Sequence, residues 1–302
     1  MRVRVRVPAT TANLGVGFDT LGLALRLYNR FEVSDDELPG LEIYGEGSEA
    51  LCNRENNAFL STLNYFTKIF NYKLPPLKVK IWNNIPIYKG LGSSATAIVA
   101  GLIIANYILG KNFTKEELIK YAVEIEGHPD NVSAAIFGGC TVSLVHNGRV
   151  VVKKILFPNF VSLIVAVPEF DVPTGLSRTK LPNSISFEVA ARSLARVGTF
   201  IASLVTENLE DLSFILEDEF HEPYRGSFIP NYNRVKKDIL DAGALGVMIS
   251  GSGPTVVVLS YKSNVKSISH SVSDIFNRYD MKVEILNLDI DQEGAVSEVN
   301  DV

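Results

Sequence analysis

The chain of 302 residues is 46% hydrophobic and 21% charged, as is typical of a folded globular protein, and its length predicts roughly two domains. The formal net charge of −5 argues against binding to nucleic acid or to a membrane surface, because both usually require a basic excess. Two cysteines, and an N-terminus without an apolar signal-peptide core, indicate a cytoplasmic protein that has no disulfide framework.

The first half of the chain predicts a mixture of strands and helices. Arginine and valine alternate from Arg2 to Val7, which is the pattern of a half-buried strand. Thr114 and Glu117 have the spacing of a capping box and mark the start of a helix. Predicted strands cover 3–7, 25–33, 42–44, 77–82, 140–145 and 150–155, and predicted helices cover 57–70, 95–109 and 114–125.

A Pro-Asn pair at 158–159 marks a junction between the two halves of the chain, and strand and helix patterns continue after it. Predicted strands cover 162–167, 246–249, 255–260 and 283–286, and predicted helices cover 186–205, 211–218, 232–241 and 265–279. Arg192 and Arg196 are expected on the outward face of the helix over 186–205. The acidic tail after Asp289 has the composition of a disordered segment. Because strands and helices interleave without strict βαβ repetition, we predict α+β layers rather than a doubly wound parallel sheet.

The most informative stretch runs from Pro86 to Thr96 and contains Gly-Leu-Gly-Ser-Ser between an extended segment and a long apolar run. Glycine lets the backbone pass close to a ligand, and a helix that begins after such a loop directs unpaired N–H groups and its positive dipole end toward it. This arrangement favours a nucleotide-phosphate site, where the serine hydroxyls could also bind Mg²⁺. A turn that only caps the helix is the alternative, and the stretch lacks the Walker and Gly-x-Gly-x-x-Gly patterns.

A second loop, from Pro8 to Asp19, follows the first strand and is rich in small residues. Asn13 and Asp19 are polar side chains of this loop that could point at a substrate. An amide can donate to a carboxylate or phosphate, and a carboxylate can hold an ammonium or hydroxyl group. A plain connection between two strands is the alternative.

Five polar side chains fall between Glu124 and Asn131, at the predicted end of a helix. Carboxylates at that end oppose the helix dipole, which hints at a bound cation. One carboxylate together with a serine hydroxyl is a common arrangement for Mg²⁺, so Glu124 and Glu126 are candidate metal ligands. A solvated helix end is the alternative, and His128 is weak evidence because no second histidine accompanies it.

Two further clusters lie in the second half of the chain. Arg178 follows Thr174 in a glycine-containing segment, and Arg225 ends the segment His-Glu-Pro-Tyr-Arg. A guanidinium group fits a carboxylate or phosphate, although a single arginine is more often a surface residue. The segment Ser-Gly-Ser-Gly-Pro at 250–254 joins two apolar strands, and it could meet a ligand through its backbone or form a tight hairpin.

Taken in order, these motifs resemble those of the GHMP small-molecule kinases, through the loop 8–19, the stretch 86–95 and the segment 250–255. Within that superfamily, the first motif with the run Leu-Gly-Leu-Ala-Leu at 21–25 is similar to the homoserine kinases, as are segments 126–131 and 221–225. The resemblance covers nearly the whole chain and leaves out the tail after Asp289. Thr11 and Val16 depart from the usual serine and proline of the family, and neither change removes a polar contact.

The resemblance implies a two-domain α+β fold, with a ribosomal-protein-S5-like domain over 1–157, a ferredoxin-like domain over 158–302 and the active site between them. It also implies ATP and Mg²⁺ as cofactors. Ser94 and one glutamate would bind the metal, and Glu124 fits the family better than Glu126. The residues that would surround the ATP phosphates are Pro86, Lys89, Gly90, Leu91, Gly92, Ser93, Ser94 and Ala95.

The function implied by the resemblance is ATP-dependent phosphorylation of the L-homoserine hydroxyl, in threonine biosynthesis. Homoserine would be held by Asn13, Asp19, Asn131, Arg178 and Arg225, and the catalytic set would be Asn13, Asp19, Thr174 and Arg178. Asp19 would accept the ammonium group and the arginines would clamp the carboxylate. The family also suggests a homodimer.

Two alternatives remain open at this point. Another GHMP kinase could act on mevalonate, shikimate or a sugar, but the paired arginines and Asp19 favour an amino acid. A non-catalytic protein of the same fold could bind ligands only, but Ser94 and the candidate metal carboxylates argue against it.

Overall fold

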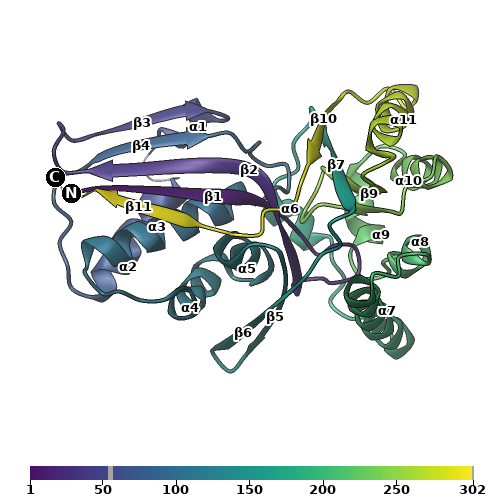
Figure 1. Cartoon of the computed structure of the whole chain (residues 1–302), viewed down its shortest axis with the longest axis horizontal. Helices are drawn as coiled ribbons and strands as arrows, with labels where there is room; N and C mark the ends of the chain where they lie inside the picture. Colours follow the sequence, from purple (N-terminus) through teal and green to yellow (C-terminus); the bar gives the residue numbers. More distant parts are fainter. Residues whose placement is uncertain (54–56, 301–302) are drawn as a thin grey trace.

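The computed structural model describes residues 1–53 and 57–300, and within them the first layer is a sheet of seven strands (Figure 1). Its order is β11-β1-β2-β4-β3, and β5 pairs with β2 and with β6. These strands are β1 (Arg2–Ala12), β2 (Leu21–Ser34), β3 (Gly40–Gly45), β4 (Lys78–Asn83), β5 (Cys140–His146), β6 (Arg149–Ile155) and β11 (Val296–Asn300). The pair β3–β4 is parallel, whereas the other described pairs of this sheet are antiparallel.

Helices cover one face of this sheet (Figure 1). They are α2 (Ala58–Ile69), α3 (Ser93–Ile108), α4 (Lys115–Glu126) and α5 (Asp130–Phe137), and the short α1 (Ser48–Leu51) follows β3. The sequence of α3 is apolar on nearly every side, as expected for a helix that is surrounded by protein, and Leu102 and Ile104 are fully buried. The valines of β1 contribute to the same core, which confirms the predicted alternation.

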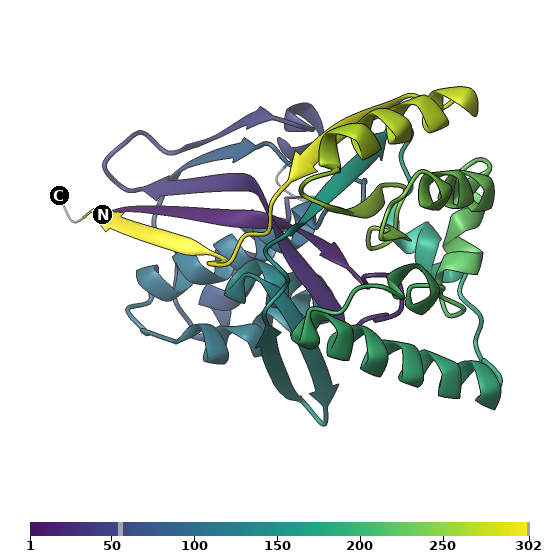
Figure 2. The same cartoon turned by 45° about the vertical axis from the view of Figure 1, so that its right-hand side comes forward.

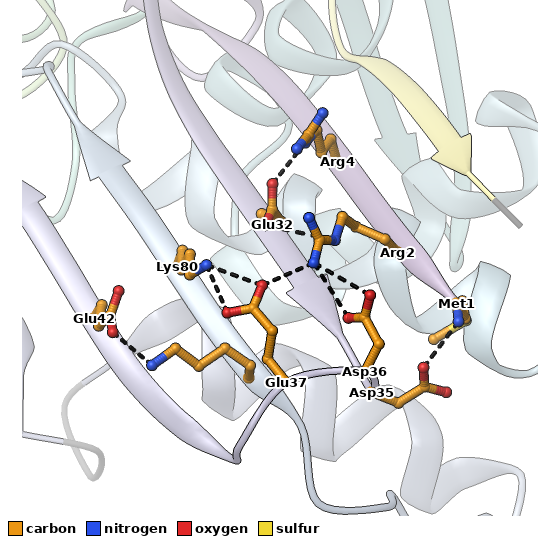
Figure 3. A network of polar contacts seen from close by, with 10 residues as sticks. Met1, Arg2, Arg4, Glu32, Asp35, Asp36, Glu37, Glu42 and Lys80 are labelled. Carbon is orange, nitrogen blue, oxygen red and sulfur yellow. Dashed lines mark hydrogen bonds and ion pairs between the residues drawn. The ribbon is translucent and has the colours of Figure 1, made fainter. Parts of the chain in front are cut away.

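Arg2 and Arg4 of β1 belong to a network of paired charges that extends over neighbouring strands (Figure 3). Arg4 Nε donates to Glu32 at 2.5 Å, and Arg2 and Lys80 both donate to Glu37 at 2.8 Å. Exposed ion pairs usually contribute less than about 1 kcal/mol each, so the network chiefly keeps this surface polar.

The second layer is an antiparallel sheet of four strands in the order β10-β7-β9-β8. Helices α10 and α11 cover one face, while α7 and α8 share a hydrophobic core with the other face and with residues of the first sheet. The elements of this half are β7 (Val161–Pro168), β8 (Gly246–Ile249), β9 (Val256–Tyr261), β10 (Val283–Leu288), α6 (Thr174–Thr179), α7 (Phe187–Thr206), α8 (Leu212–Ile215), α9 (Glu222–Arg225), a 3₁₀ helix (Gly226–Phe228), α10 (Tyr232–Asp241) and α11 (Val265–Arg278). The two layers confirm the predicted α+β class.

The tail after Asp289 is ordered as far as residue 300, so the expectation of disorder is wrong for 290–300. β11 pairs with β1 in antiparallel register, with Val299 opposite Val3. Asp291 is buried and accepts hydrogen bonds from the Tyr28 hydroxyl at 2.8 Å and from the Gly294 N–H at 2.6 Å. The acidic residue therefore organises a turn. Because β11 pairs with β1, residues 296–300 belong to the first sheet although they fall in the predicted second domain. The predicted domain boundary between residues 157 and 158 otherwise stays a prediction.

Three predicted helical features also differ from the structure. The helix predicted at 211–218 is reduced to α8, and the segment after Gly127, for which no helix was predicted, contains α5. Gly127 ends α4 with a φ of 88° and Pro129 caps α5, so this punctuation separates two helices. Arg192 is 53% exposed as predicted, but Arg196 is only 16% exposed and pairs with Glu219 at 3.1 Å.

A buried histidine connects the loop after β1 to the second half of the chain. His221 is fully buried, and its Nε2 donates to the Gly15 carbonyl at 2.7 Å. Its Nδ1 has no partner among the described residues. Burial lowers the pKa of His221, and this effect outweighs the nearby Asp218 carboxylate, which raises it. The junction is therefore formed with a neutral imidazole ring.

The lowered pKa of His221 makes folding stability depend on pH. At low pH, His221 binds a proton in the unfolded chain that it does not bind in the folded chain. The stabilising contribution of the buried His221 is therefore complete above the unfolded pKa of about 6.5 and is lost as the pH falls below it. We expect a slope of at most about 1.4 kcal/mol per pH unit in the free energy of unfolding. Urea unfolding of the wild type and of His221→Gln, which keeps a donor for Gly15, at about pH 5.5 to 7.5 measures the difference. A difference that does not vary with pH would contradict this role.

Candidate active site

A cavity of about 470 Å³ is lined by residues from both halves of the chain. It brings together most of the side chains that the sequence singled out. The predicted site residues that line it are Asn13, Asp19, Pro86, Lys89, Gly90, Leu91, Gly92, Ser93, Ser94, Glu126, Asn131, Arg178 and Arg225. Ala95 and Glu124 are not among its lining residues.

The glycines of the loop before α3 are required by close contacts with other parts of the protein. Gly92 has a φ of +69°, and a Cβ atom there would lie 1.9 Å from Thr10 Oγ1. Gly90 has a φ of +76°, and its Cβ would lie 2.2 Å from the Ser250 carbonyl oxygen. α3 begins directly after this loop, so its first N–H groups and its positive dipole end face the cavity wall formed by Ser93 and Ser94.

The three sequence motifs meet through backbone groups. Ser250 Oγ donates to the Gly90 carbonyl at 2.7 Å, and the Gly251 N–H donates to the Ala12 carbonyl at 3.2 Å. The Gly251 carbonyl in turn accepts from Asn13 Nδ2 at 3.0 Å. The segment 250–254 therefore fastens the loop 8–19 to the loop 86–95, which supports its interpretation as part of the site rather than a separate hairpin.

One end of the cavity combines two arginines with carboxylates. Arg178 Nη2 and Asp19 Oδ1 form an ion pair of 2.8 Å, and the Asp19 N–H donates to Asn13 Oδ1 at 3.1 Å. Arg225 is buried and donates to the Gly251 carbonyl at 2.8 Å. Burial lowers the pKa of Arg225 to about 10, helped by the like charge of Arg178. Two guanidinium groups so close together favour an anionic ligand.

His128 and Asp130 are site residues that the sequence analysis did not select. His128 Nδ1 lies 2.7 Å from Asp130 Oδ1, which also accepts from the Asn131 N–H. Asn131 Oδ1 accepts from Thr10 Oγ1 at 2.7 Å. Burial alone would lower the pKa of His128, but the hydrogen bond and charge of Asp130 raise it overall. Ligand atoms of Asp19, His128 and Asp130 lie within 4.8 Å of one another. Their adjacency depends on α5, which the sequence did not predict.

The two candidate glutamates point in different directions. Glu126 is largely buried in the cavity, where Ser94 Oγ donates to its Oε2 at 3.4 Å and His128 Nε2 lies 3.9 Å from its Oε1. Burial raises the pKa of Glu126. Glu124 instead accepts from the Tyr65 hydroxyl at 2.8 Å, at the exposed side of α2. This placement reverses the preference for Glu124.

Two other predicted residues make contacts within the protein, and a third is only partly described. The Lys89 ammonium donates to the carbonyl oxygens of Glu169 and Phe170 at 2.9 and 2.8 Å, so it links the loop to the segment that follows β7. Ala95 is fully buried in α3. Thr174 begins α6, and its side chain lies outside the part of the chain that the structure describes.

The other end of the cavity is mainly apolar, with the amides of Asn29, Asn57 and Asn83 among its lining. Phe31, Leu51, Phe59, Ile81 and Ile87 line it, and they come from five separate segments between β2 and the loop before α3. The rings of Phe31 and Phe59 stack with centroids 5.1 Å apart. Such residues read as ordinary core in the sequence, so no motif marked them. The cavity thus has an apolar end, a helix N-terminus in the middle and a charged end.

Comparison with known proteins agrees with this geometry. The family model described as "GHMP kinases N terminal domain" matches residues 57–139, and "GHMP kinases C terminal" matches residues 200–278. A homoserine kinase from Carboxydothermus hydrogenoformans is 39% identical over 303 residues, which cover 99% of this chain and 97% of the relative. A homoserine kinase from Clostridium botulinum is 38% identical, covering 97% of this chain and 98% of the relative.

A solved structure extends the likeness to three dimensions. The crystal structure of homoserine kinase from Cytophaga hutchinsonii superposes with a TM-score of 0.86 at 27% identity, and covers 98% of this chain and 97% of its own. The match confirms the two-domain α+β fold that the motifs implied. Full-length identity well above 30% and matches to both domains lead to one conclusion. This chain is a member of the homoserine kinase family of the GHMP kinases.

Proposed function

We propose that this chain phosphorylates the hydroxyl group of L-homoserine with ATP, giving O-phospho-L-homoserine for threonine biosynthesis. The observation that carries the proposal is one cavity in which a helix N-terminus lies between an apolar end and a pair of arginines with Asp19. Homoserine carries an ammonium group, a carboxylate and a hydroxyl, which match that charged end. The names of the relatives support the same acceptor.

The apolar end and the loop 86–95 fit the two parts of ATP. The base would lie among Phe31, Phe59 and Ile81, where apolar side chains exclude water. The phosphates would lie at the start of α3, where free N–H groups and the helix dipole favour negative charge. The nucleotide would thereby direct its terminal phosphate toward the charged end.

Glu126 and Ser94 fit a magnesium ion. A largely buried carboxylate beside a serine hydroxyl supplies the oxygen ligands that Mg²⁺ prefers. Burial raises the pKa of Glu126 and outweighs the opposing charge of His128. When bound, the ion would neutralise charge on the phosphates. We therefore propose Glu126 as the metal ligand and assign Glu124 no direct role.

The residues at the charged end would position homoserine for in-line attack. The carboxylate groups of Asp19 and Asp130 lie close enough together to hold the ammonium group, and Arg178 and Arg225 offer a fork for the carboxylate. Asn13 and Asn131 are fixed by hydrogen bonds and can orient the substrate. Phosphoryl transfer depends mainly on such positioning and on neutralising charge, so Asp19 is assigned to binding and not to proton removal.

We also propose that the protein works as a homodimer in a reducing, cytoplasmic compartment. Both cysteines are free thiols, and Cys52 is exposed whereas Cys140 is buried. Burial raises the pKa of Cys140 to about 12, so this thiol is unreactive. Among the described helices, α7 alone is long and apolar enough to cross a membrane, and length and composition are weak evidence by themselves.

An assay of ADP release with L-homoserine, L-serine, L-threonine, mevalonate and shikimate as acceptors tests the function. We expect L-homoserine to give the highest kcat/KM. A higher value with another acceptor would assign a different GHMP kinase activity, and tight ATP binding without ADP release from any acceptor would indicate a ligand-binding protein.

The two glutamates provide a matched pair of variants. Glu126→Gln removes a metal ligand, so we expect the Mg²⁺ concentration for half-maximal activity to rise about 10- to 100-fold. Glu124→Gln only weakens a surface hydrogen bond to Tyr65, so we expect a change of less than about twofold. Titration of activity with Mg²⁺ at saturating ATP measures both. The assignment fails if the two variants respond alike or in the opposite order.

Arg178 provides a test of carboxylate recognition. In Arg178→Met a charge-assisted contact with homoserine is lost, so we expect KM for homoserine to rise at least about 30-fold, which corresponds to about 2 kcal/mol. KM for ATP should change less than about threefold, because the nucleotide binds at the other end of the cavity. Arg149→Met, on the exposed hairpin of β5 and β6, is the control. Equal effects on the two KM values would argue against a role in acceptor binding.

A further inference from the structure

α7 carries apolar side chains on the side that faces away from the protein. Phe187, Leu194 and Val205 are 85%, 76% and 63% exposed. Ala191, Gly198 and Ala202 are also exposed. At about 100° per residue, these six positions fall within an arc of about 80°. We call Phe187, Ala191, Leu194, Gly198, Ala202 and Val205 the α7 stripe. Figure 2 shows α7 along the edge of the second half, and no described element covers its outer side.

The charged side chains of α7 lie away from this stripe. Arg192 binds Glu219 at 2.6 Å, and Arg196 pairs with Glu217 and Glu219 at 3.5 and 3.1 Å. The α7 stripe itself contains no charge and no polar side chain. A typical surface helix has the opposite arrangement, with its polar side in water. The outer side of α7 is therefore built to meet another apolar surface.

Gly198 gives a second, independent indication that another surface packs against α7. Glycine within a helix lowers stability by about 1 kcal/mol relative to alanine. A Cβ atom at Gly198 would have no atom within 4 Å, so the packing of the chain itself does not require a glycine there. A surface that approaches α7 closely at this point would explain the residue.

The α7 stripe is complementary to itself when two copies run antiparallel. A two-fold axis that passes the stripe at the level of residue 196 places Phe187 opposite Val205 of a second copy and Leu194 opposite Gly198, while Ala191 and Ala202 lie one residue out of register with each other. The largest residue in the middle of the stripe would thus fill the space left by the smallest. A two-fold interface requires this kind of self-complementarity.

We infer that the α7 stripe is the contact surface between two copies of this chain. The inference goes beyond phosphoryl transfer and rests on the homodimer proposed above. α7 has 20 residues and is therefore about 30 Å long, similar to the width of an interface that buries about 800 Å² on each partner. A lipid surface fits less well, because the exposed charges of α7 include Glu188 as well as Arg192 rather than an excess of basic residues, and the net charge is −5.

Two substitutions in the α7 stripe test the inference from opposite directions. Leu194→Glu places a charge in the contact, and Gly198→Leu adds bulk where Leu194 of the second copy would insert. Gly198→Leu should also raise the thermal stability of the protomer, because leucine favours helix, so loss of the dimer could not be attributed to unfolding. Leu38→Glu, at an 87% exposed leucine after β2, is the matched control.

Sedimentation velocity at protein concentrations of about 1 to 100 μM gives the dimer dissociation constant. We expect a dimeric wild type and control, and a dissociation constant raised at least about 30-fold in both stripe variants. Monomeric wild type would overturn the inference and the proposed homodimer together. Dimeric stripe variants would overturn the inference alone. Binding of the wild type to phosphatidylcholine vesicles that is lost in Leu194→Glu would overturn it in favour of a lipid surface, and acceptor specificity in the ADP-release assay is independent of all these outcomes.

Discussion

The carbonyl group of Gly251 accepts hydrogen bonds from Asn13 and from Arg225, at the place where the two sheets face each other. Close to it, the Ser250 hydroxyl donates to Gly90 in the loop that precedes α3. These bonds involve backbone groups that can approach only because glycines leave the space free, as the contacts at Gly90 and Gly92 demonstrate. The rest of the cavity depends on this junction, since it fixes the helix N-terminus of one half against the arginines of the other.

The junction also divides the cavity into regions with different electrostatics. On one side, Arg178 and Arg225 stand close together, and burial lowers the pKa of Arg225 to about 10. On the other side, burial raises the pKa of Glu126 beside the start of α3. In both Arg225 and Glu126, burial disfavours the charged form of the side chain, and a ligand of opposite charge would offset this cost. A substrate with a carboxylate would match the two arginines, and a nucleotide with a bound cation would match Glu126. Both ligands are therefore needed to satisfy both groups.

Much of this arrangement could be predicted from the sequence, because the information is local. The glycine-serine loop, the capping box and the alternation in β1 each depend on neighbouring residues, and their elements are confirmed. What the sequence did not provide depends on distant contacts. Glu124 and Glu126 face different surroundings because they are two residues apart, about half a turn of α4, and because Tyr65 on α2 binds Glu124. His128 and Asp130 meet only because α5 begins after Pro129. The acidic tail was misjudged because composition does not reveal that Asp291 caps a turn against Tyr28.

The pairing of β11 with β1 has a consequence for biosynthesis. β1 is synthesised nearly 300 residues before β11, its partner on one side. Until residue 300 emerges, one edge of β1 is left unpaired, and an open edge can recruit strands of other chains. The nascent protein must therefore complete its second sheet while the first is still unfinished. Synthesis of β11 covers the open edge of β1, so a chain that stalls before β11 is made leaves this edge of β1 exposed.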